Sequence, residues 1–271
     1  MKKIKFLKMD GVGNDFVVID NRGSGVARGI SLPKMAQFIC RRKTSVGADG
    51  LLVLEKSRKA DFRMRIFNAD GSEAEMCGNG LRCAVLYAGK KGKINIETMA
   101  GMHGAEITGR NKVKINMAEP KGLKQDIAIK VNSRPIKAHY IDTGVPHAVI
   151  FVQGIDDIDV DSIGRAVRYH DKFRPRGTNV DFVEIMDDKN IKIRTYERGV
   201  EGETLACGTG AVASAIMAGS RIKTHVPGSK IRVCTRGGKL DIYFKISGRN
   251  VKDVYLEGEA RKVYRGEVDY V

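Results

Sequence analysis

Apolar side chains recur at every second position in residues 62–67 and again in residues 191–196. Such alternation is typical of a β-strand with one buried face. Each segment leads through a glycine-rich loop into small and apolar residues at helical spacing, over residues 81–88 and 212–216. The pattern therefore predicts a strand, a loop and a helix twice along the chain.

Three further segments complete the predicted elements. Residues 32–42 have the spacing of an amphipathic helix, and residues 94–117 and 231–256 are patterned as paired strands. The glycines expected at the turns between these strands are Gly101, Gly104, Gly237 and Gly238. The glycines expected to end the two central helices are Gly89 and Gly219. Strands dominate and do not alternate regularly with helices, so we predict an α+β fold.

The two strand, loop and helix segments are copies of one pattern. Each contains an arginine in the strand, then a glycine and two glutamates, and then Cys-Gly-x-Gly before the helix. The first copy comprises Arg65, Gly71, Glu73, Glu75 and Cys77, and the second comprises Arg194, Gly199, Glu201, Glu203 and Cys207. Weaker echoes relate residues 94–98 to 231–235, and residues 14–17 to 179–183.

An internal repeat with a period near half the chain indicates two lobes of one ancestral design. A loop signature follows a predicted strand at residues 119–122, and we expect the boundary there. The N-terminal lobe then comprises residues 1–118 and carries Cys77, and the C-terminal lobe comprises residues 119–261 and carries Cys207.

The charge of the chain raises the question of nucleic-acid binding. Its 271 residues include 48 basic and 32 acidic side chains, a net charge of +16. The basic residues are spread in twos and threes, without interleaved aromatic residues, which favours a solvated surface over nucleic-acid binding. No stretch reaches the roughly 18 apolar residues of a membrane span, and the N-terminus lacks the apolar run of a signal peptide. We therefore expect a cytoplasmic protein without nucleic-acid or membrane partners.

The five cysteines divide into two groups. Their odd number and the lack of a Cys-x-x-Cys pair argue against a disulfide scaffold and a zinc site. Cys40, Cys83 and Cys234 lie within apolar patterns and are expected to be packing residues. Cys77 and Cys207 occupy the same place in both repeats, which points to working thiols.

A cysteine at the start of a helix has a distinctive chemistry. The positive end of the helix dipole lowers the pKa of its thiol toward neutrality, and neighbouring glycines leave room for a ligand. The free backbone N–H groups there can hold a carboxylate or a phosphate. Two such thiols on opposite sides of one molecule suit the inversion of a stereocentre, because one thiolate removes a proton while the other thiol donates one.

Five motifs follow one another along the chain. They are Gly-Val-Gly-Asn-Asp-Phe at 11–16, Phe-Asn-Ala-Asp-Gly-Ser-Glu at 67–73, Met-Cys-Gly-Asn-Gly-Leu-Arg-Cys at 76–83, Thr-Gly-Val-Pro-His at 143–147, and Tyr-Glu-Arg-Gly at 196–199 with Cys-Gly-Thr-Gly at 207–210. In this order, over nearly the whole chain, they resemble the diaminopimelate epimerase family. The resemblance implies two pseudo-symmetric lobes, each a mixed or antiparallel β-sheet wrapped around a central α-helix. It also implies an active site in the cleft between the lobes, with residues 262–271 joined to the first lobe.

The activity implied by the resemblance is the cofactor-independent interconversion of LL- and meso-2,6-diaminopimelate, in lysine and peptidoglycan precursor biosynthesis. Cys77 and Cys207 would be the acid/base thiols of a homodimeric enzyme that binds a small molecule and needs no metal. His147 and Glu197 would tune the pKa values of the thiols. The residues implied in substrate binding are Asn14, Asn68, Gly78, Asn79, Asn179, Glu197, Arg198, Gly208 and Thr209.

The side-chain chemistry of these residues is compatible with the implied roles. Arg198 suits a distal carboxylate and Glu197 an ammonium group, although read alone they would be an exposed ion pair. Asn68, read alone, would be a turn residue.

The chain departs from the family pattern at three positions. The family often has His where Asp10 stands and an amide side chain where Val145 stands, and some members have Gln where Gly50 stands. Because Val145 and Gly50 cannot form side-chain hydrogen bonds, they are given no ligand role.

Two other functions remain open from the residues. Another two-cysteine enzyme, such as a proline racemase-like enzyme, would use the same thiols on a cyclic amino acid. A basic nucleic-acid-binding module would use the repeat as a saddle. Activity on mono-amino acids would indicate the first, and salt-dependent DNA binding that persists without the two thiols would indicate the second.

Overall fold

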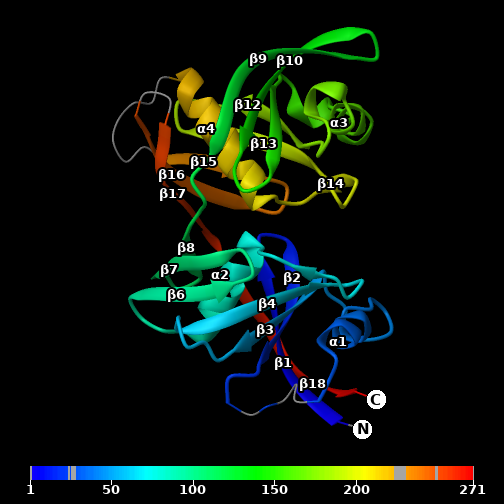
Figure 1. Ribbon diagram of the computed structural model, residues 1–271, viewed down its shortest axis with the longest axis vertical. Coiled ribbons are helices and arrows are strands. Elements are labelled where there is room, and N and C mark those ends of the chain that lie inside the picture. The colour runs from blue at the N-terminus through cyan, green and yellow to red at the C-terminus, as the bar shows by residue number, and fades with distance from the viewer. Residues whose placement is uncertain (1, 24, 26–28, 223–229, 248–249, 271) are drawn as a thin grey trace. The chain divides into compact units, whose positions relative to one another are not determined.

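The computed structural model describes residues 2–23, 25, 29–222, 230–247 and 250–270 (Figure 1). The chain divides into two compact units. Unit 1 contains Met1–Ile115 together with Gly258–Val271, and unit 2 contains Asn116–Glu257. The expected α+β class is confirmed, since each unit is built mainly of strands around few helices.

Unit 1 holds a mixed sheet and two helices. Its strands are β1 (Lys2–Gly11), β2 (Asn14–Asp20), β3 (Gly50–Glu55), β4 (Phe62–Asn68), β5 (Glu73–Ala74), β6 (Lys93–Thr98), β7 (Gly101–Gly109), β8 (Lys112–Asn116) and β18 (Arg261–Tyr270). Its helices are α1 (Leu32–Ile39) and α2 (Gly78–Ala88). Strand β2 runs parallel to β3, and β4 parallel to β6, while the pairs β1–β18, β1–β2, β3–β4, β4–β5, β6–β7 and β7–β8 are antiparallel.

Strand β3 explains how the helices of unit 1 are arranged. The run from Leu51 to Leu54 is apolar at every position, and all four side chains are fully buried. A strand that is apolar on both faces needs cover on both, and here α1 and α2 each contact β3. The start of α2 is thereby fixed against the sheet.

Unit 2 repeats this plan. Its strands are β9 (Lys121–Val131), β10 (Arg134–Asp142), β11 (Pro146–Phe151), β12 (Asn179–Ile185), β13 (Asn190–Glu197), β14 (Gly202–Thr204), β15 (Lys230–Cys234), β16 (Lys239–Ser247) and most of β17 (Asn250–Glu259). Its helices are α3 (Val160–Arg168) and α4 (Gly208–Ile222), with short 3₁₀ turns at Ile155–Asp157 and Asp171–Phe173. Strand β11 is parallel to β12, and β13 to β15, while β12–β13, β13–β14 and β15–β16 are antiparallel.

The pairing shows which strands of the two units are equivalent. In each unit a strand, a peripheral helix and a parallel strand precede the central helix, so β2, α1 and β3 correspond to β11, α3 and β12. The echo between residues 14–17 and 179–183 was therefore wrong, because it matched β2 with β12. Similar local sequence occurred at two different places in the sheet.

The register also corrects one detail of the repeat. Arg65 forms an ion pair with Glu73 at 2.7 Å, and Arg194 forms one with Glu203 at 2.7 Å. These pairs hold the hairpins β4–β5 and β13–β14. Glu73 thus corresponds to Glu203, and matching it with Glu201 was wrong because the second loop is longer.

Most of the expected elements are confirmed, and two of the expected glycine positions are corrected. Gly89 ends α2 in the left-handed conformation at φ 66°, as expected. Gly219 does not end α4, because it lies inside the helix, where a Cβ atom would come within 2.7 Å of the Phe244 ring. Gly104 lies within β7, opposite Asn95, and the turn is formed before Gly101.

Helix α3 is among the elements that the pattern did not predict, which also include strands β1, β3 and β9–β12. Asp159 caps it by accepting a hydrogen bond from the Ser162 backbone N–H at 3.1 Å, and Val160 and Val167 are buried. Only nine residues long and rich in charge, it resembles a solvated loop in sequence. Residues 32–42 were expected to be helical, and α1 ends earlier, at Ile39.

Candidate active site

Both cysteines of the repeated motif stand directly before a central helix, as predicted. The carbonyl oxygen of Cys77 accepts a hydrogen bond from the Leu81 N–H at 2.8 Å, and that of Cys207 accepts one from the Ala211 N–H at 2.9 Å. These are the first hydrogen bonds of α2 and α4. The Cys77 side chain is half-buried, and Cys207 is only 7% exposed.

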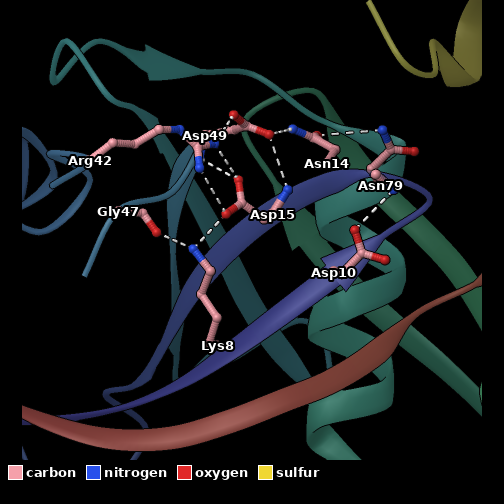
Figure 2. Close-up of polar contacts among 9 residues, drawn as sticks. Lys8, Asp10, Asn14, Asp15, Arg42, Gly47, Asp49 and Asn79 are labelled. Carbon is pink, nitrogen blue, oxygen red and sulfur yellow. Dashed lines mark hydrogen bonds and ion pairs between the residues drawn. The ribbon is translucent and has the colours of Figure 1, made fainter. Parts of the chain in front are cut away.

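In unit 1, Cys77 contacts the amide of Asn14 at the start of β2. The Asn14 Oδ1 atom lies 3.8 Å from the Cys77 Sγ atom and accepts a hydrogen bond from Asn79 Nδ2 at 3.4 Å. The Asn14 Nδ2 atom donates to Asp49 at 2.7 Å (Figure 2). The predicted residues Asn14, Cys77 and Asn79 are therefore in contact within unit 1.

The orientation of both amides is fixed by charges at the two ends of a hydrogen-bond chain. Arg82 Nη2 donates to Asn79 Oδ1 at 2.8 Å, and Asp49 accepts from Asn14. A guanidinium can only donate and a carboxylate can only accept, so the two asparagines between them must point the same way. Cys77 therefore faces a carbonyl oxygen.

The charged ends of this chain differ in burial. Arg82 is fully buried, also donates to the Gly78 carbonyl at 3.2 Å, and its Nε atom has no hydrogen-bond partner among the described residues. Asp49 is exposed and lies in a cluster with Arg42, the partly buried Asp15 and the buried Lys8, in which Arg42 contacts both carboxylates at 2.7 Å (Figure 2). Burial lowers the pKa of Arg82.

In unit 2, Cys207 lies in a different electrostatic setting. Its Sγ atom is 3.4 Å from Thr209 Oγ1 and accepts a hydrogen bond from the Gly210 N–H at 3.4 Å. Burial, followed by the charges of Glu197 and Asp181, raises the pKa of the Cys207 thiol well above its usual value. The expectation that the helix start lowers this pKa was wrong, because desolvation and two carboxyl groups outweigh the helix dipole.

Glu197 ends β13 beside Cys207. It accepts a hydrogen bond from Thr204 Oγ1 at 2.5 Å. Burial raises the pKa of its carboxyl group, and the hydrogen bond from Thr204 acts in the opposite direction. Glu197 and Cys207 influence each other electrostatically, so a predicted modulating residue does lie near a predicted thiol.

His147 is fully buried and bonded to a carboxyl group that the sequence reasoning missed. Its Nδ1 atom is 2.7 Å from Asp181 Oδ2, and Thr195 Oγ1 donates to Asp181 Oδ1 at 2.8 Å. His147, Asp181 and Thr195 are each no more than 2% exposed. The sequence does contain a signal for Asp181, because it is an aspartate in the middle of the mostly apolar strand Asn179–Ile185. A buried carboxyl group is rare unless it has a polar partner.

The two glycines of each Cys-Gly-x-Gly motif have different surroundings. A Cβ atom on Gly78 or Gly208 would meet only ordinary van der Waals contacts, 3.4 Å or longer. A Cβ atom on Gly80 would come within 3.0 Å of Leu52, and one on Gly210 would collide with Asp181. The first glycine therefore leaves space, whereas the second permits close packing of the helix on the sheet.

The other residues predicted to bind substrate are placed less uniformly. Asn179 is buried, and its amide accepts from the Arg198 N–H at 2.8 Å and donates to the Pro146 carbonyl at 3.0 Å. The Arg198 guanidinium donates to the Arg176 carbonyl at 3.1 Å. Asn68 is exposed, and its Nδ2 atom donates to Ser72 Oγ in the β4–β5 turn. This hydrogen bond is separate from those around Cys77.

The three departures from the family pattern have structural settings of their own. Asp10 accepts a hydrogen bond from the Gly13 N–H at 2.9 Å. Gly50 has no room for a side chain, since a Cβ atom would come within 2.9 Å of the Phe67 carbonyl. Val145 is half-buried, and its carbonyl accepts from the Thr143 N–H at 3.1 Å.

The remaining cysteines fit the expected packing role to different degrees. Cys40 and Cys83 are buried, and burial raises the pKa of Cys40 to about 12 and that of Cys83 further. Cys234 is half-buried at the end of β15. Within the described ranges, no group of three or more His, Cys, Asp or Glu side chains could hold a metal ion. No helix in the described part of the chain is long and apolar enough to cross a membrane.

Comparisons with known proteins agree over the whole chain. The family model described as diaminopimelate epimerase matches residues 6–123 and 139–263. A diaminopimelate epimerase from Hydrogenobaculum is 44% identical, with 97% of this chain and 98% of the relative covered. One from Aquifex aeolicus is 42% identical, with 98% of each covered.

Solved structures show the same fold at low sequence identity. A Bacillus anthracis phenazine biosynthesis protein of the PhzF family is 18% identical, with a TM-score of 0.75 and all of both chains covered. A probable proline racemase from Agrobacterium radiobacter is 18% identical, with a TM-score of 0.70 and coverage of 99% and 93%. These structures share the arrangement of strands and helices.

Proposed function

The chain belongs to the diaminopimelate epimerase family, and from this premise we propose that it interconverts LL- and meso-2,6-diaminopimelate through two cysteine thiols. Membership makes the chain an isomerase. The assignment of the thiols, the binding residues and the independence from cofactors are our proposals. We further propose that the reaction serves lysine and peptidoglycan precursor biosynthesis.

One observation carries the proposed chemistry: an equivalent cysteine stands directly before the central helix in each unit. Free N–H groups at a helix start favour a negative charge beside them. Cys77 and Cys207 are thus placed alike by the fold, one in each unit. We propose that in the catalytic state both thiols act on one α-carbon, each from its own side.

The proton transfer balances without another reactant. The thiolate removes the α-proton and becomes a thiol, the electron pair stays on the α-carbon, and the second thiol delivers its proton to the opposite face. The second cysteine then carries the negative charge, ready for the reverse reaction. The configuration at one carbon is inverted, and the other end of the substrate is unchanged.

The electrostatic difference between the cysteines supports a resting assignment. Because burial and the Glu197 and Asp181 carboxyl groups raise the pKa of Cys207, we propose that this residue is the protonated thiol of the resting enzyme. Cys77 then supplies the base. Which enantiomer each cysteine serves is a separate question, since the roles exchange on every turnover.

The binding residues fit the two ends of diaminopimelate. We propose that the backbone N–H groups at Gly78, Asn79, Gly208 and Thr209 hold the carboxylate next to the reacting carbon and stabilise the charge that develops there. Arg198 would bind the distal carboxylate with help from Asn68 and Asn179, and Glu197, which lies beside Cys207, would bind an ammonium group. Asn179 already holds the backbone of Arg198, so its part would be to position that residue.

Isotope exchange tests the proposed function. LL-diaminopimelate incubated with the enzyme in D₂O should gain deuterium at an α-carbon as the meso isomer forms, without added pyridoxal phosphate or metal. Cys77→Ser and Cys207→Ser should each lose interconversion, and the matched control Cys234→Ser should retain it. A strict requirement for an added cofactor, or full activity in either serine variant, would refute the proposal.

Two coarser expectations have their own tests. We propose that the enzyme is a cytoplasmic homodimer. Light scattering coupled to size-exclusion chromatography should give twice the mass of the 29.8 kDa chain. Fractionation of cells that produce the protein should place it with cytoplasmic markers.

A further inference from the structure

The two units differ beneath the central helix at three equivalent positions of the sheet. In unit 1, Leu52 of β3 pairs with Ile66 of β4, and in unit 2, Asp181 of β12 pairs with Thr195 of β13. Two residues before Leu52, Gly50 pairs with Phe16, just as Asn179 pairs with His147 two residues before Asp181. The trio Phe16, Leu52 and Ile66 therefore corresponds to the trio His147, Asp181 and Thr195.

The second glycine of the Cys-Gly-x-Gly motif lies against all three residues of the trio in unit 1 and against Asp181 of the trio in unit 2. A Cβ atom on Gly80 would meet Leu52, Ile66 and Phe16 at 3.0, 3.4 and 3.6 Å. A Cβ atom on Gly210 would collide with Asp181 and lie 3.3 Å from the Cys207 Cβ. Asp181 thus borders the same small space as Cys207.

The polar trio of unit 2 is not needed to build this fold. Unit 1 fills the equivalent space with apolar side chains, and an apolar trio avoids the cost of removing a carboxyl, an imidazole and a hydroxyl from water. Retaining polar groups there at no more than 2% exposure points to a role in the chemistry of Cys207.

We infer that Asp181 is a positioning residue, which holds His147 in one tautomer and makes Cys207 the cysteine that is protonated in the resting enzyme. Its carboxyl oxygens accept from Thr195 and from Nδ1 of His147, at 2.8 and 2.7 Å. The Nδ1 proton is thereby directed to Asp181, and Nε2 is left buried without a hydrogen-bond partner among the described residues. This inference rests on the proposed function only for the role of Cys207.

Several groups around Cys207 act on its protonation, and the experiment must separate them. Glu197 faces it from β13, Asp181 from β12, and Thr209 and the Gly210 N–H from its own helix. His147, on β11, acts on Glu197 and binds Asp181. Leu256, on β17, is apolar and lies 3.4 Å from where a Cβ atom on Gly208 would stand.

The test compares Asp181→Asn with Asp241→Asn. Asp241 is another buried carboxylate of unit 2, at 6% exposure, but it pairs with Arg232 at 2.9 Å. The readout is the rate of iodoacetamide alkylation at each cysteine against pH, mapped by mass spectrometry, with Cys77 as the internal reference. Asp181→Asn should shift the Cys207 midpoint down by about one pH unit or more, because one nearby negative charge is lost. Asp241→Asn should leave the alkylation midpoint of both cysteines unchanged.

A second variant covers the case in which Asp181→Asn does not fold. The triple change His147→Phe, Asp181→Leu and Thr195→Ile copies the apolar trio of unit 1. It should unfold at a urea concentration no lower than that of the parent, while the Cys207 midpoint falls.

An unchanged Cys207 midpoint in whichever of these variants folds would overturn the inference. If both variants fail to fold, the trio is structural and the inference is likewise overturned. Alkylation needs no substrate, so a parent protein without epimerase activity would refute the proposed function and leave this result readable.

Discussion

At the scale of single residues, hydrogen bonds to charged groups set the orientation of neutral side chains. The amide of Asn14 has two nearly identical ends, and hydrogen bonds alone decide which one faces Cys77. The bond to Asp49, at 2.7 Å and to a charged group, is stronger than the 3.4 Å bond to Asn79. Asp49 therefore does most to hold the Asn14 carbonyl oxygen toward the thiol.

Replacing this carboxylate should weaken the reaction more than the fold. In Asp49→Asn the new amide can donate as well as accept, so Asn14 can turn its Nδ2 atom toward Cys77. We expect kcat/KM to fall about tenfold, equivalent to about 1.4 kcal/mol of lost positioning. Steady-state rates with LL-diaminopimelate measure this, and Asp20→Asn, at the far end of β2, is the control. Equal rates in both variants would contradict the orienting role of Asp49.

The neighbouring Asp15 should make unit 1 sensitive to acid. Burial opposes ionisation of Asp15, but hydrogen bonds and charge from Lys8 and Arg42 lower its pKa to about 2. A lowered pKa stabilises the fold above the unfolded value near 4, and the contribution is lost as pH falls toward 2. The difference between the folded and unfolded pKa values of Asp15 corresponds to about 2 kcal/mol of the free energy of unfolding. Urea unfolding at pH 7 and pH 2.5 should show a smaller acid loss in Asp15→Asn than in the parent.

The pH dependence of the rate follows from Cys207. The acid must be protonated, so its raised pKa keeps the reaction running to alkaline pH and sets the limb where the rate declines. We expect a bell-shaped profile of kcat/KM, with apparent pKa values that belong to the coupled pair of thiols. A rate that rises steadily with pH would exclude a thiol acid.

At the scale of elements, the second motif glycine decides how closely each central helix approaches its sheet. Gly80→Ala meets the flexible tip of Leu52 at 3.0 Å, whereas Gly210→Ala collides with Asp181, which two hydrogen bonds hold in place. We expect the free energy of unfolding to fall by about 1 kcal/mol in Gly80→Ala and by about 3 kcal/mol in Gly210→Ala. Urea unfolding would show the order, and equal losses would mean that the buried aspartate can move aside.

The same scale shows what the sequence could predict. Alternation in residues 62–67 and 191–196 is a local property, and both strands were predicted correctly. The motif cysteines were placed at helix starts because glycine and small residues leave a local signature. Helix α3 was missed because its stability comes from packing on β12 and β13, which a pattern within the helix does not show. Gly219 was misplaced because a helix can require glycine for contact with Phe244 as well as for its end.

For the candidate site, the positions of the two cysteines were more predictable than their electrostatics. Cys77 and Cys207 were found from their repeated surroundings, which are visible in the sequence. The raised pKa of Cys207 depends on Asp181 and Glu197, which only the folded sheet brings near it. Asp181 was overlooked for the same reason, since its partners His147 and Thr195 lie on other strands.

At the scale of the whole molecule, the proposed chemistry requires a cysteine from each unit at one carbon. Such thiols should be able to form a disulfide when no substrate separates them. Mild oxidation of the parent should therefore give a Cys77–Cys207 link, mapped by mass spectrometry and restored to thiols with full activity by a reductant. Oxidative inactivation without that link would contradict the common site. Substrate present during oxidation should protect both cysteines.

The last strand has a consequence for how the protein is made. Strand β18 pairs with β1 from Lys2 opposite Tyr270 to Asp10 opposite Arg261, and the rings of Phe6 and Tyr264 touch at a centroid distance of 5.9 Å. On the ribosome, β1 emerges long before β18 and must wait for it before it gains this neighbour. Unit 2, by contrast, is continuous and can fold as soon as it has left the exit tunnel. The half of the molecule that is synthesised first is thus the half that is finished last.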